Sequence, residues 1–197
     1  MHCAVIARIL LFMNTRLTPA EEHVVLVDEA NTVLGTAPKA TVHQKMTPLH
    51  RGFSAFLFYP DGQLLLQQRS HKKKTWPLMW SNSVCGHPAL SEDVLDAAQR
   101  RMRDELGITA VHALTVASPY RYQFSKDGVM ENEICPILIG RIANTPTPNP
   151  DEVEAVRTVP WDAFLREIAA DTEAYSPWCI EEAYILDTLH SEGVPLW

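Results

Sequence analysis

The chain has 197 residues, of which 46% are hydrophobic and 21% charged, and this composition fits one globular domain with a proper core. Its 17 Lys and Arg against 24 Asp and Glu give a formal net charge of −7, which argues against a general nucleic-acid binder because such binding depends on neutralising phosphates. The four cysteines lie far apart and form no C-x-x-C pair, so we expect neither a disulfide framework nor a cysteine-rich zinc site, and a reducing compartment.

The N-terminal residues differ in character from the rest of the chain. Residues 1–13 are apolar enough to resemble the core of a signal peptide, but Arg8 interrupts them and no small-x-small cleavage site follows. No apolar run approaches the ~20 residues that span a bilayer. We therefore expect residues 1–20 to be a poorly ordered extension and residues 21–197 to form a single domain. The protein should be a cytoplasmic monomer that acts on a small molecule and binds neither nucleic acid nor membrane.

Strand signals dominate the first half of the chain. Apolar and β-branched runs predict strands at residues 23–28, 32–36, 53–59 and 63–69. Pro60-Asp61-Gly62 separates the last two and is a strong hairpin signal. A polar segment (residues 38–49) and a basic loop (residues 70–75) are predicted to be irregular.

The second half of the chain mixes helices and strands. Ser91 or Asp93 is expected to cap a helix that runs to about Leu106, with Gly107 just past its end. Further strands are predicted near residues 113–124, 131–139 and 153–159, and Pro136 should place the middle one near an edge or bulge. Two more helices are predicted at residues 162–170 and 177–191, the last with Ser176 as N-cap and Pro177 at its first position. This order is typical of an α+β sandwich.

The stretch around Cys85 carries the most specific motif. Positions i and i+2 of an extended segment point to the same side, so Cys85 and His87 could face one pocket. The spacing from Gly86 to Ile108 reads Gly-x5-Glu-x7-Arg-x-U-x-x-Glu-x-Gly-U, where U is apolar. That frame resembles the Nudix box, a loop-helix-loop that holds a divalent metal against a diphosphate.

A set of histidines and glutamates could hold a metal ion. Individually, His43 and His50 could be ordinary loop residues, and Glu131 and Glu133 could form a solvated strand face. Together with His87, however, they would supply three imidazoles and two carboxylates, which suit a six-coordinate divalent ion with one open position. A closed structural zinc site would normally take four ligands rich in thiolate.

Four motifs together resemble one family. They are His43-x6-His50, the run from Trp80 to Pro88, Tyr122 ahead of Glu131-Asn132-Glu133, and Ser176-Pro177-Trp178. On them the chain is similar to the type I isopentenyl-diphosphate isomerases, a family of the Nudix superfamily. The resemblance implies a mixed β-sheet sandwich with helices packed on both faces. It also implies an intramolecular isomerase of isoprenoid biosynthesis that moves the C=C bond of isopentenyl diphosphate to give dimethylallyl diphosphate.

The resemblance also implies a role for each site residue. Cys85 and Glu133 would transfer protons on opposite faces of the alkene, with Tyr122 assisting by a hydrogen bond. Trp178 would cover the pocket. Glu105 would hold a Mg²⁺ that bridges to the diphosphate. A second metal site would hold Mn²⁺ or Mg²⁺, with Zn²⁺ as a further candidate, and its ligands would be His43, His50, His87, Glu131 and Glu133. The phosphate oxygens would be bound by Arg69, Lys73 and Arg101.

Two other functions fit parts of the sequence. One is a Nudix diphosphate hydrolase, and the other is a regulatory metal-binding module without enzymatic activity. In Nudix hydrolases the frame carries glutamates where this chain has Arg101 and Asp104, which leaves Glu105 with Asp104 in support. With fewer carboxylates, this cluster would activate a metal-bound water poorly. The reduced cluster therefore favours chemistry in which the diphosphate stays intact.

Overall fold

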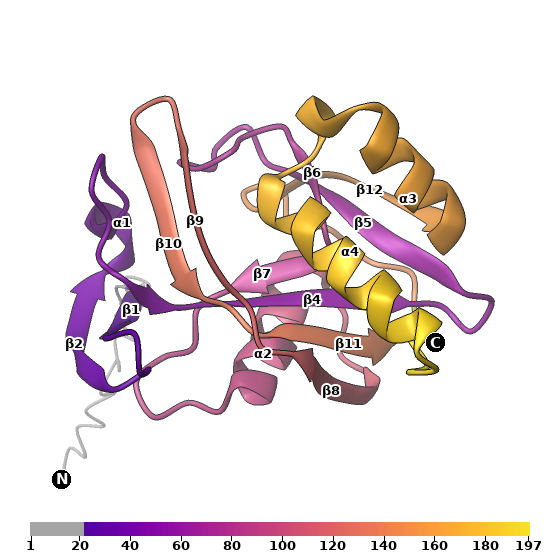
Figure 1. Cartoon of the computed structure of the whole chain (residues 1–197), viewed down its shortest axis with the longest axis horizontal. Helices are drawn as coiled ribbons and strands as arrows, with labels where there is room; N and C mark the ends of the chain where they lie inside the picture. Colours follow the sequence, from indigo (N-terminus) through magenta and orange to yellow (C-terminus); the bar gives the residue numbers. More distant parts are fainter. Residues whose placement is uncertain (1–21) are drawn as a thin grey trace, which may run out of the picture.

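The computed structural model describes residues 22–197, and the predicted extension at residues 1–20 lies outside them. These residues form two β-sheets (Figure 1). The smaller sheet has the strand order β2-β1-β3-β10-β9, and β10 pairs in parallel with β3. Its strands are β1 (His23–Val27), β2 (Val33–Pro38), β3 (His50–Arg51), β9 (Arg121–Lys126) and β10 (Val129–Ile134).

The larger sheet has the order β12-β5-β4-β11-β8, with β6 beside β5 and β7 beside β4. All six residues of β4 are buried because side chains pack on both faces of this central strand, which explains its continuous apolar run. The hairpin predicted around Pro60-Asp61-Gly62 joins β4 to β5. The strands are β4 (Phe53–Phe58), β5 (Gln63–Arg69), β6 (Trp80–Ser81), β7 (Val84–Gly86), β8 (His112–Ser118), β11 (Ile137–Arg141) and β12 (Val153–Pro160).

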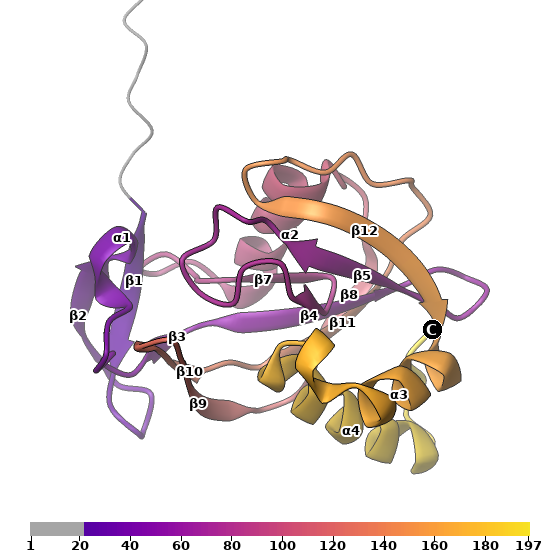
Figure 2. The ribbon, with the colours of Figure 1, turned by 90° about the horizontal axis from the view of Figure 1, so that it is seen from above.

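Helices cover both faces of the larger sheet, so the predicted α+β sandwich is confirmed (Figure 2). The helix α2 (Val94–Leu106) buries Ala98 and Met102 in the core on one face. The helices α3 (Trp161–Ala170) and α4 (Pro177–Ser191) pack on the other. Several short elements were not predicted: α1 (Lys39–Val42), the 3₁₀ turn η1 (Thr172–Ala174) and the two-residue strands β3 and β6. No helix within residues 22–197 is long and apolar enough to cross a membrane.

The cap residues of α2 lie where the sequence predicted them. Of the two candidate N-caps, Asp93 is the one used: its side chain accepts a hydrogen bond of 2.8 Å from the backbone N–H of Leu95. Gly107 ends the helix with φ of 64°, a left-handed conformation that glycine adopts without a Cβ penalty.

Two predicted strands turn out to be four, and this correction locates the site. The segments 113–124 and 131–139 each break at a proline, Pro119 and Pro136, and their halves belong to different sheets. Proline has no N–H to continue a ladder, so the chain can leave one sheet there and enter the other. The connection from β3 to β4 makes the same change at Gly52, whose N–H bonds the Ile134 carbonyl over 2.9 Å. We call this junction of the two sheets the seam.

Candidate active site

A cavity of about 570 Å³ opens at the seam. It is lined from both sheets, from the basic loop and from the first turn of α4, and we call it the seam pocket. Of the predicted site residues, His50 and Glu105 do not line it; they lie behind its wall, 0% and 1% exposed. The other predicted residues all line it: His43, Arg69, Lys73, Cys85, His87, Arg101, Tyr122, Glu131, Glu133 and Trp178.

Four of the five predicted ligands of the His/Glu site converge. One ligand atom from each of His43, His50, His87 and Glu133 lies within 4.8 Å of the others. Glu133 Oε1 is 3.0 Å from His87 Nε2 and 3.4 Å from His50 Nε2. The fifth predicted ligand, Glu131, reaches the cluster through His43, since its Oε2 is 2.9 Å from His43 Nε2.

Strand pairing explains the convergence of the ligands on the smaller sheet. His50 on β3 is the register partner of Glu133 on β10. The loop that follows His43 is fastened to β10 as well, because Thr47 Oγ1 donates to the Met130 carbonyl over 2.6 Å. The carboxylates of Glu131 and Glu133 are two residues apart on β10 and both are buried on the same face.

The Nudix-like frame holds the loop that carries His87. Arg100 donates two hydrogen bonds to the Glu92 carboxylate, of 2.9 and 2.8 Å, and a third of 3.2 Å to the His87 carbonyl. Glu92 in turn accepts a bond of 2.8 Å from the backbone N–H of Ala89. The Glu and Arg of the frame therefore act as a clamp on the loop between Gly86 and α2.

The buried nitrogen and oxygen atoms of the His/Glu cluster are suited to binding a divalent metal. His43 Nε2, His50 Nε2 and Glu131 Oε2 are buried and make no well-formed hydrogen bond among residues 22–197; they lie against one another or against Glu133, at 2.9 Å for His43 and Glu131 and 3.4 Å for His50 and Glu133. Buried polar atoms without partners are costly, and imidazole with carboxylate is a donor set that divalent metals bind. Burial lowers the pKa of His87 to about 4, so the ring is neutral near pH 7, the form that ligates. For Glu133, His87 and His50 outweigh burial and hold the carboxyl pKa well below its usual value.

Cys85 lies on β7 of the larger sheet and faces the same pocket. Its Sγ donates to Asn82 Oδ1 over 3.1 Å and lies 3.6 Å from Ser54 Oγ. Burial, followed by the nearby Glu182 carboxyl, raises the pKa of the thiol to about 12, so the sulfur carries its proton at neutral pH. The strand β7 (Val84–Gly86) thus brings a thiol to a pocket whose carboxylates Glu131 and Glu133 come from the other sheet.

Aromatic rings form one wall of the pocket. Trp178 at the start of α4 stacks on Tyr122, with centroids 5.8 Å apart, and meets Trp76 edge-on at 5.2 Å. The Arg69 guanidinium carbon lies 5.3 Å from the centroid of the Trp178 ring, and Arg69 Nη2 donates a hydrogen bond of 2.7 Å to the Thr75 carbonyl. Burial raises the pKa of Tyr122 well above its usual value, which keeps its hydroxyl protonated. Because Arg69 bonds the Thr75 carbonyl, it also organises the basic loop, a role that the sequence did not suggest.

The start of α4 is fixed by a hydroxyl pair instead of the expected side-chain cap. Ser176 is the N-cap residue and Pro177 follows it, as predicted. However, Ser176 Oγ lies 2.8 Å from Ser81 Oγ on β6 and makes no capping bond to its own helix. This contact ties the helix that carries Trp178 to the strand that leads to Cys85.

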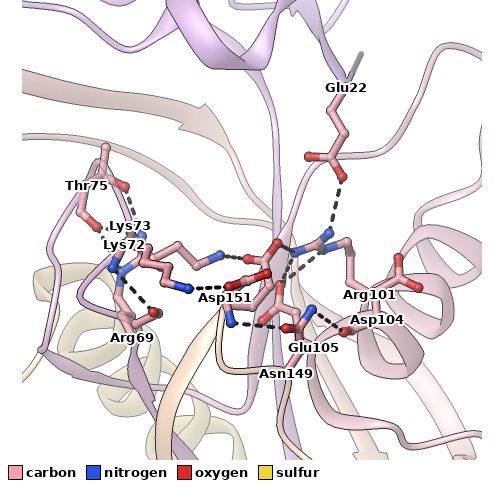
Figure 3. A network of polar contacts seen from close by, with 12 residues as sticks. Glu22, Arg69, Lys72, Lys73, Thr75, Arg101, Asp104, Glu105, Asn149 and Asp151 are labelled. Carbon is pink, nitrogen blue, oxygen red and sulfur yellow. Dashed lines mark hydrogen bonds and ion pairs between the residues drawn. The ribbon is translucent and has the colours of Figure 1, made fainter. Parts of the chain in front are cut away.

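Lys73 and Arg101, two of the cations that line the pocket, belong to a network of ion pairs with carboxylates (Figure 3). The Lys73 ammonium pairs with the Glu152 carboxylate. The Arg101 guanidinium lies 2.7 Å from Glu105, 3.2 Å from Glu152 and 3.2 Å from Glu22. Burial would raise the pKa of Glu152, but Lys73 and Arg101 outweigh it and hold the pKa at about 2. Of the predicted basic cluster, Lys73 and Arg101 are therefore closely paired with carboxylates, whereas Arg69 bonds the carbonyls of Thr75 and Trp76.

Lys39 and Glu152 belong to this network but were not predicted from the sequence, and Asp104 differs from expectation. Lys39 lines the pocket and pairs with Glu22 over 2.6 Å, but it lies in a polar segment without a motif. Glu152 follows a proline-rich loop and gave no signal either. Asp104, expected to support Glu105, is exposed, whereas Glu105 is buried with its Oε2 unpaired among the described residues.

Replacing Gly52 by alanine is expected to lower metal affinity. A Cβ at this position would lie 1.8 Å from Glu133 Oε2, so the carboxylate must move away from the histidines. We expect a folded protein with a lower melting temperature, since overpacking costs about 1–3 kcal/mol. Its bound divalent metal, measured by titration with Mn²⁺, should fall.

The matched control for this prediction is Gly140→Ala on β11. A Cβ there would lie 2.9 Å from Val111 Cγ1, in the core and away from the seam pocket. It should lower the melting temperature without changing Mn²⁺ affinity. Equal Mn²⁺ affinity in Gly52→Ala and wild type would contradict the placement of the Glu133 carboxylate in the metal cluster.

The chain is similar to known proteins over most of its length. The family model of the NUDIX domain matches residues 48–179. A curated isopentenyl-diphosphate Delta-isomerase from Saccharopolyspora erythraea is 44% identical over 82% of this chain and 84% of its own length. One from Mycolicibacterium vanbaalenii is 43% identical over 86% and 94%.

Solved structures share the fold at low sequence identity. A protein from Deinococcus radiodurans has a TM-score of 0.66 at 24% identity, covering 83% of this chain and 98% of that chain. A MutT protein from Methanosarcina mazei has a TM-score of 0.59 at 18% identity, covering 73% and 96%.

Proposed function

Because this chain belongs to the isopentenyl-diphosphate Delta-isomerase family within the Nudix family, we propose that its seam pocket interconverts isopentenyl diphosphate and dimethylallyl diphosphate. This reaction supplies both five-carbon units of isoprenoid biosynthesis. As expected from the sequence, the enzyme would act as a cytoplasmic monomer. The observation that carries the proposal is a thiol and a carboxylate, Cys85 and Glu133, that come from different sheets and line one pocket.

The chemistry explains why two such groups are needed. Moving an unactivated C=C bond requires that one carbon gains a proton and another loses one, through a state with carbocation character. Two acid/base groups on either side of a flat, dry pocket can do this without transferring the same proton. We assign these roles to Cys85 and Glu133, with the Tyr122 hydroxyl as a hydrogen-bond donor beside Glu133, its register partner on β9.

The pocket wall suits a transient positive charge. The π-face of Trp178 can stabilise it by roughly 2 kcal/mol when desolvated. Trp76 and Tyr122 hold the Trp178 ring in place. The reacting carbons would lie against this ring.

The ends of the pocket would hold the diphosphate and its cations. Arg69, Lys73 and Arg101 would bind phosphate oxygens, and Lys39 lies close enough to join them. A Mn²⁺ or Mg²⁺ would be held by the His/Glu cluster and a Mg²⁺ near Glu105. When bound, such ions neutralise phosphate charge and fix the orientation of carboxylates. The cluster ligands are His43, His50, His87, Glu131 and Glu133.

Diphosphate hydrolysis is the alternative, and a direct assay separates the two. The Arg101 guanidinium bonds Glu105 where a hydrolase of this superfamily would carry a further glutamate, so the carboxylates that would activate a water are fewer. We expect incubation with isopentenyl diphosphate and Mg²⁺ to yield dimethylallyl diphosphate without release of phosphate or pyrophosphate. Release of either anion without isomerisation would identify a hydrolase.

A further inference from the structure

A relay of hydrogen bonds behind the seam pocket ends at the proposed catalytic thiol. Asn82 lies between β6 and β7 and is 0% exposed. Its Oδ1 accepts a hydrogen bond of 3.1 Å from Cys85 Sγ and another of 2.9 Å from Ser81 Oγ. Its Nδ2 donates to the carbonyls of Ala55 and Val84 over 3.1 and 2.9 Å. Both lone pairs and both N–H groups of this amide are therefore used.

The two backbone carbonyls fix which end of the amide faces the sulfur. Carbonyls only accept, so the amide of Asn82 cannot turn over without placing its oxygen against both of them. Asn82 thus presents an acceptor to Cys85, and the thiol is the donor of the bond between them. A cysteine sulfur moves by rotation about a single bond, so this contact selects the rotamer of Cys85. The Ser54 hydroxyl lies farther from the sulfur, at 3.6 Å.

The direction of the relay follows from the single proton that each hydroxyl carries. Ser81 gives its proton to Asn82 Oδ1, which can only accept. The Ser81 oxygen must therefore accept from Ser176 Oγ, which lies 2.8 Å away. Both serines are 0% exposed, so bulk water offers neither of them an alternative partner. The bonds run from Ser176 through Ser81 to Asn82, where they meet the bond from the thiol.

The relay connects two walls of the pocket that come from distant parts of the chain. Ser176 precedes α4, whose second residue, Trp178, lines the pocket, and Cys85 lies on β7. The backbone repeats this connection, because the Ser176 N–H donates to the Trp80 carbonyl over 2.9 Å. The three relay residues are not among the described residues that line the pocket. They can therefore set the position of the thiol without touching the substrate.

We propose that Asn82 is a positioning residue for isomerisation: supported by the Ser176–Ser81 relay, its Oδ1 fixes the Cys85 sulfur in the rotamer that faces the seam pocket. The inference rests on the proposed function for its catalytic meaning. Proton transfer at carbon requires the sulfur in contact with the alkene, and a misplacement of about 1 Å can cost roughly 100-fold in rate. The hydrogen-bond arrangement itself does not depend on that function and can be tested separately.

Kinetics of the full-length protein test the catalytic part. Asn82→Leu keeps a side chain of similar size without the acceptor. It should lower kcat by roughly 10–100-fold with little change in KM, because no group that touches the substrate is removed. Ser81→Ala should lower kcat less, by about 3–10-fold, since Asn82 keeps both of its carbonyl partners. In the Ser81→Ala background, Ser176→Ala should have little further effect, because it acts through Ser81.

Ser83→Ala is the matched control. Ser83 is equally buried, but its hydroxyl donates to the Leu65 carbonyl and accepts from the Leu57 N–H, away from the relay. Its replacement should lower the melting temperature and leave kcat and KM unchanged. A Ser83→Ala variant as impaired in kcat as Ser81→Ala would overturn the proposal, because loss of any buried hydroxyl would then suffice.

Infrared spectroscopy tests the arrangement without turnover. The S–H stretch of Cys85, isolated as the difference between wild type and Cys85→Ala, should lie at the lower frequency of a hydrogen-bonded thiol. It should move to higher frequency in Asn82→Leu and keep its position in Ser83→Ala. A wild-type band at the frequency of an unbonded thiol, or a band unchanged in Asn82→Leu, would overturn the proposal. So would additive effects of Ser81→Ala and Ser176→Ala on kcat.

Two outcomes leave the proposal decidable by other measurements. If Asn82→Leu does not fold, the wild-type band and the comparison of Ser81→Ala with Ser83→Ala decide. A wild type that does not isomerise refutes the proposed function, and the infrared result still decides the arrangement of the thiol and the amide.

Discussion

Replacing Cys85 by alanine is expected to abolish isomerisation while leaving metal content and melting temperature near those of wild type. The thiol lines the pocket but is no member of the metal cluster, so its loss removes one proton-transfer group and little else. General acid–base groups contribute about 10²–10⁴-fold to rate, and the loss here should reach the upper end because no other residue is assigned to proton transfer on that face of the alkene. Product formation followed by NMR, with Mn²⁺ titration and a melting curve on the same sample, measures all three quantities.

Cys179→Ala is the matched control for this variant. Cys179 is a fully buried thiol, whereas Cys85 is partly buried, and Cys179 follows Trp178 on α4 without lining the pocket. Its replacement should lower stability by roughly 1 kcal/mol through lost packing and leave turnover close to wild type. A Cys85→Ala protein that kept about a tenth of wild-type activity would contradict the assignment, because an acid–base group is expected to contribute more than that. A single-base mechanism through Glu133 would then replace it.

Replacing Glu133 by glutamine should be equally damaging, for two reasons at once. Glu133 Oε1 lies within hydrogen-bond distance of His87, and the carboxylate would both ligate the metal and transfer a proton. An amide of the same size cannot serve as an acid or base, so kcat should fall by about 10⁴-fold or more. Bound metal should fall as well.

Glu131→Gln separates the two effects. Glu131 is two residues away on the same strand face and is proposed as a metal ligand only. Its replacement should weaken metal binding, and excess Mn²⁺ or Mg²⁺ should restore turnover by mass action. Excess metal should not restore Glu133→Gln. If it did, Glu133 would act only as a ligand, and the second proton-transfer group would have to be sought elsewhere in the pocket.

Local signals in the sequence account for much of the fold. Asp93 and Gly107 bound α2 as predicted, because capping chemistry is encoded by the cap residue and its immediate neighbours. The spacing of Glu92 and Arg100 likewise identified the Nudix-like frame. What the sequence could not show was the seam. The strands at residues 113–124 and 131–139 were predicted as continuous, because sheet membership depends on distant partners that no local pattern reveals.

The sequence predicted which residues form the site more completely than it predicted the contacts between them. The convergence of His43, His50, His87 and Glu133 was expected from the resemblance and is present. The carboxylates that pair with the cations of the pocket were not anticipated, since Glu152 lies 79 residues from Lys73 in the sequence. Glu182 was missed for a further reason: a glutamate on an amphipathic helix is usually solvated, and only packing shows that this one is buried.

Isomerisation of isopentenyl diphosphate in D₂O, followed by NMR, tests the two-group mechanism most directly. If Cys85 and Glu133 act from opposite faces, the proton added comes from a group that exchanges with solvent and the proton removed goes to the other. Solvent deuterium should then appear in the new methyl group of dimethylallyl diphosphate, and label lost from the deprotonated carbon of the substrate should not reappear there. Migration of that label into the methyl group, or a methyl group without solvent deuterium, would contradict proton transfer by two separate residues.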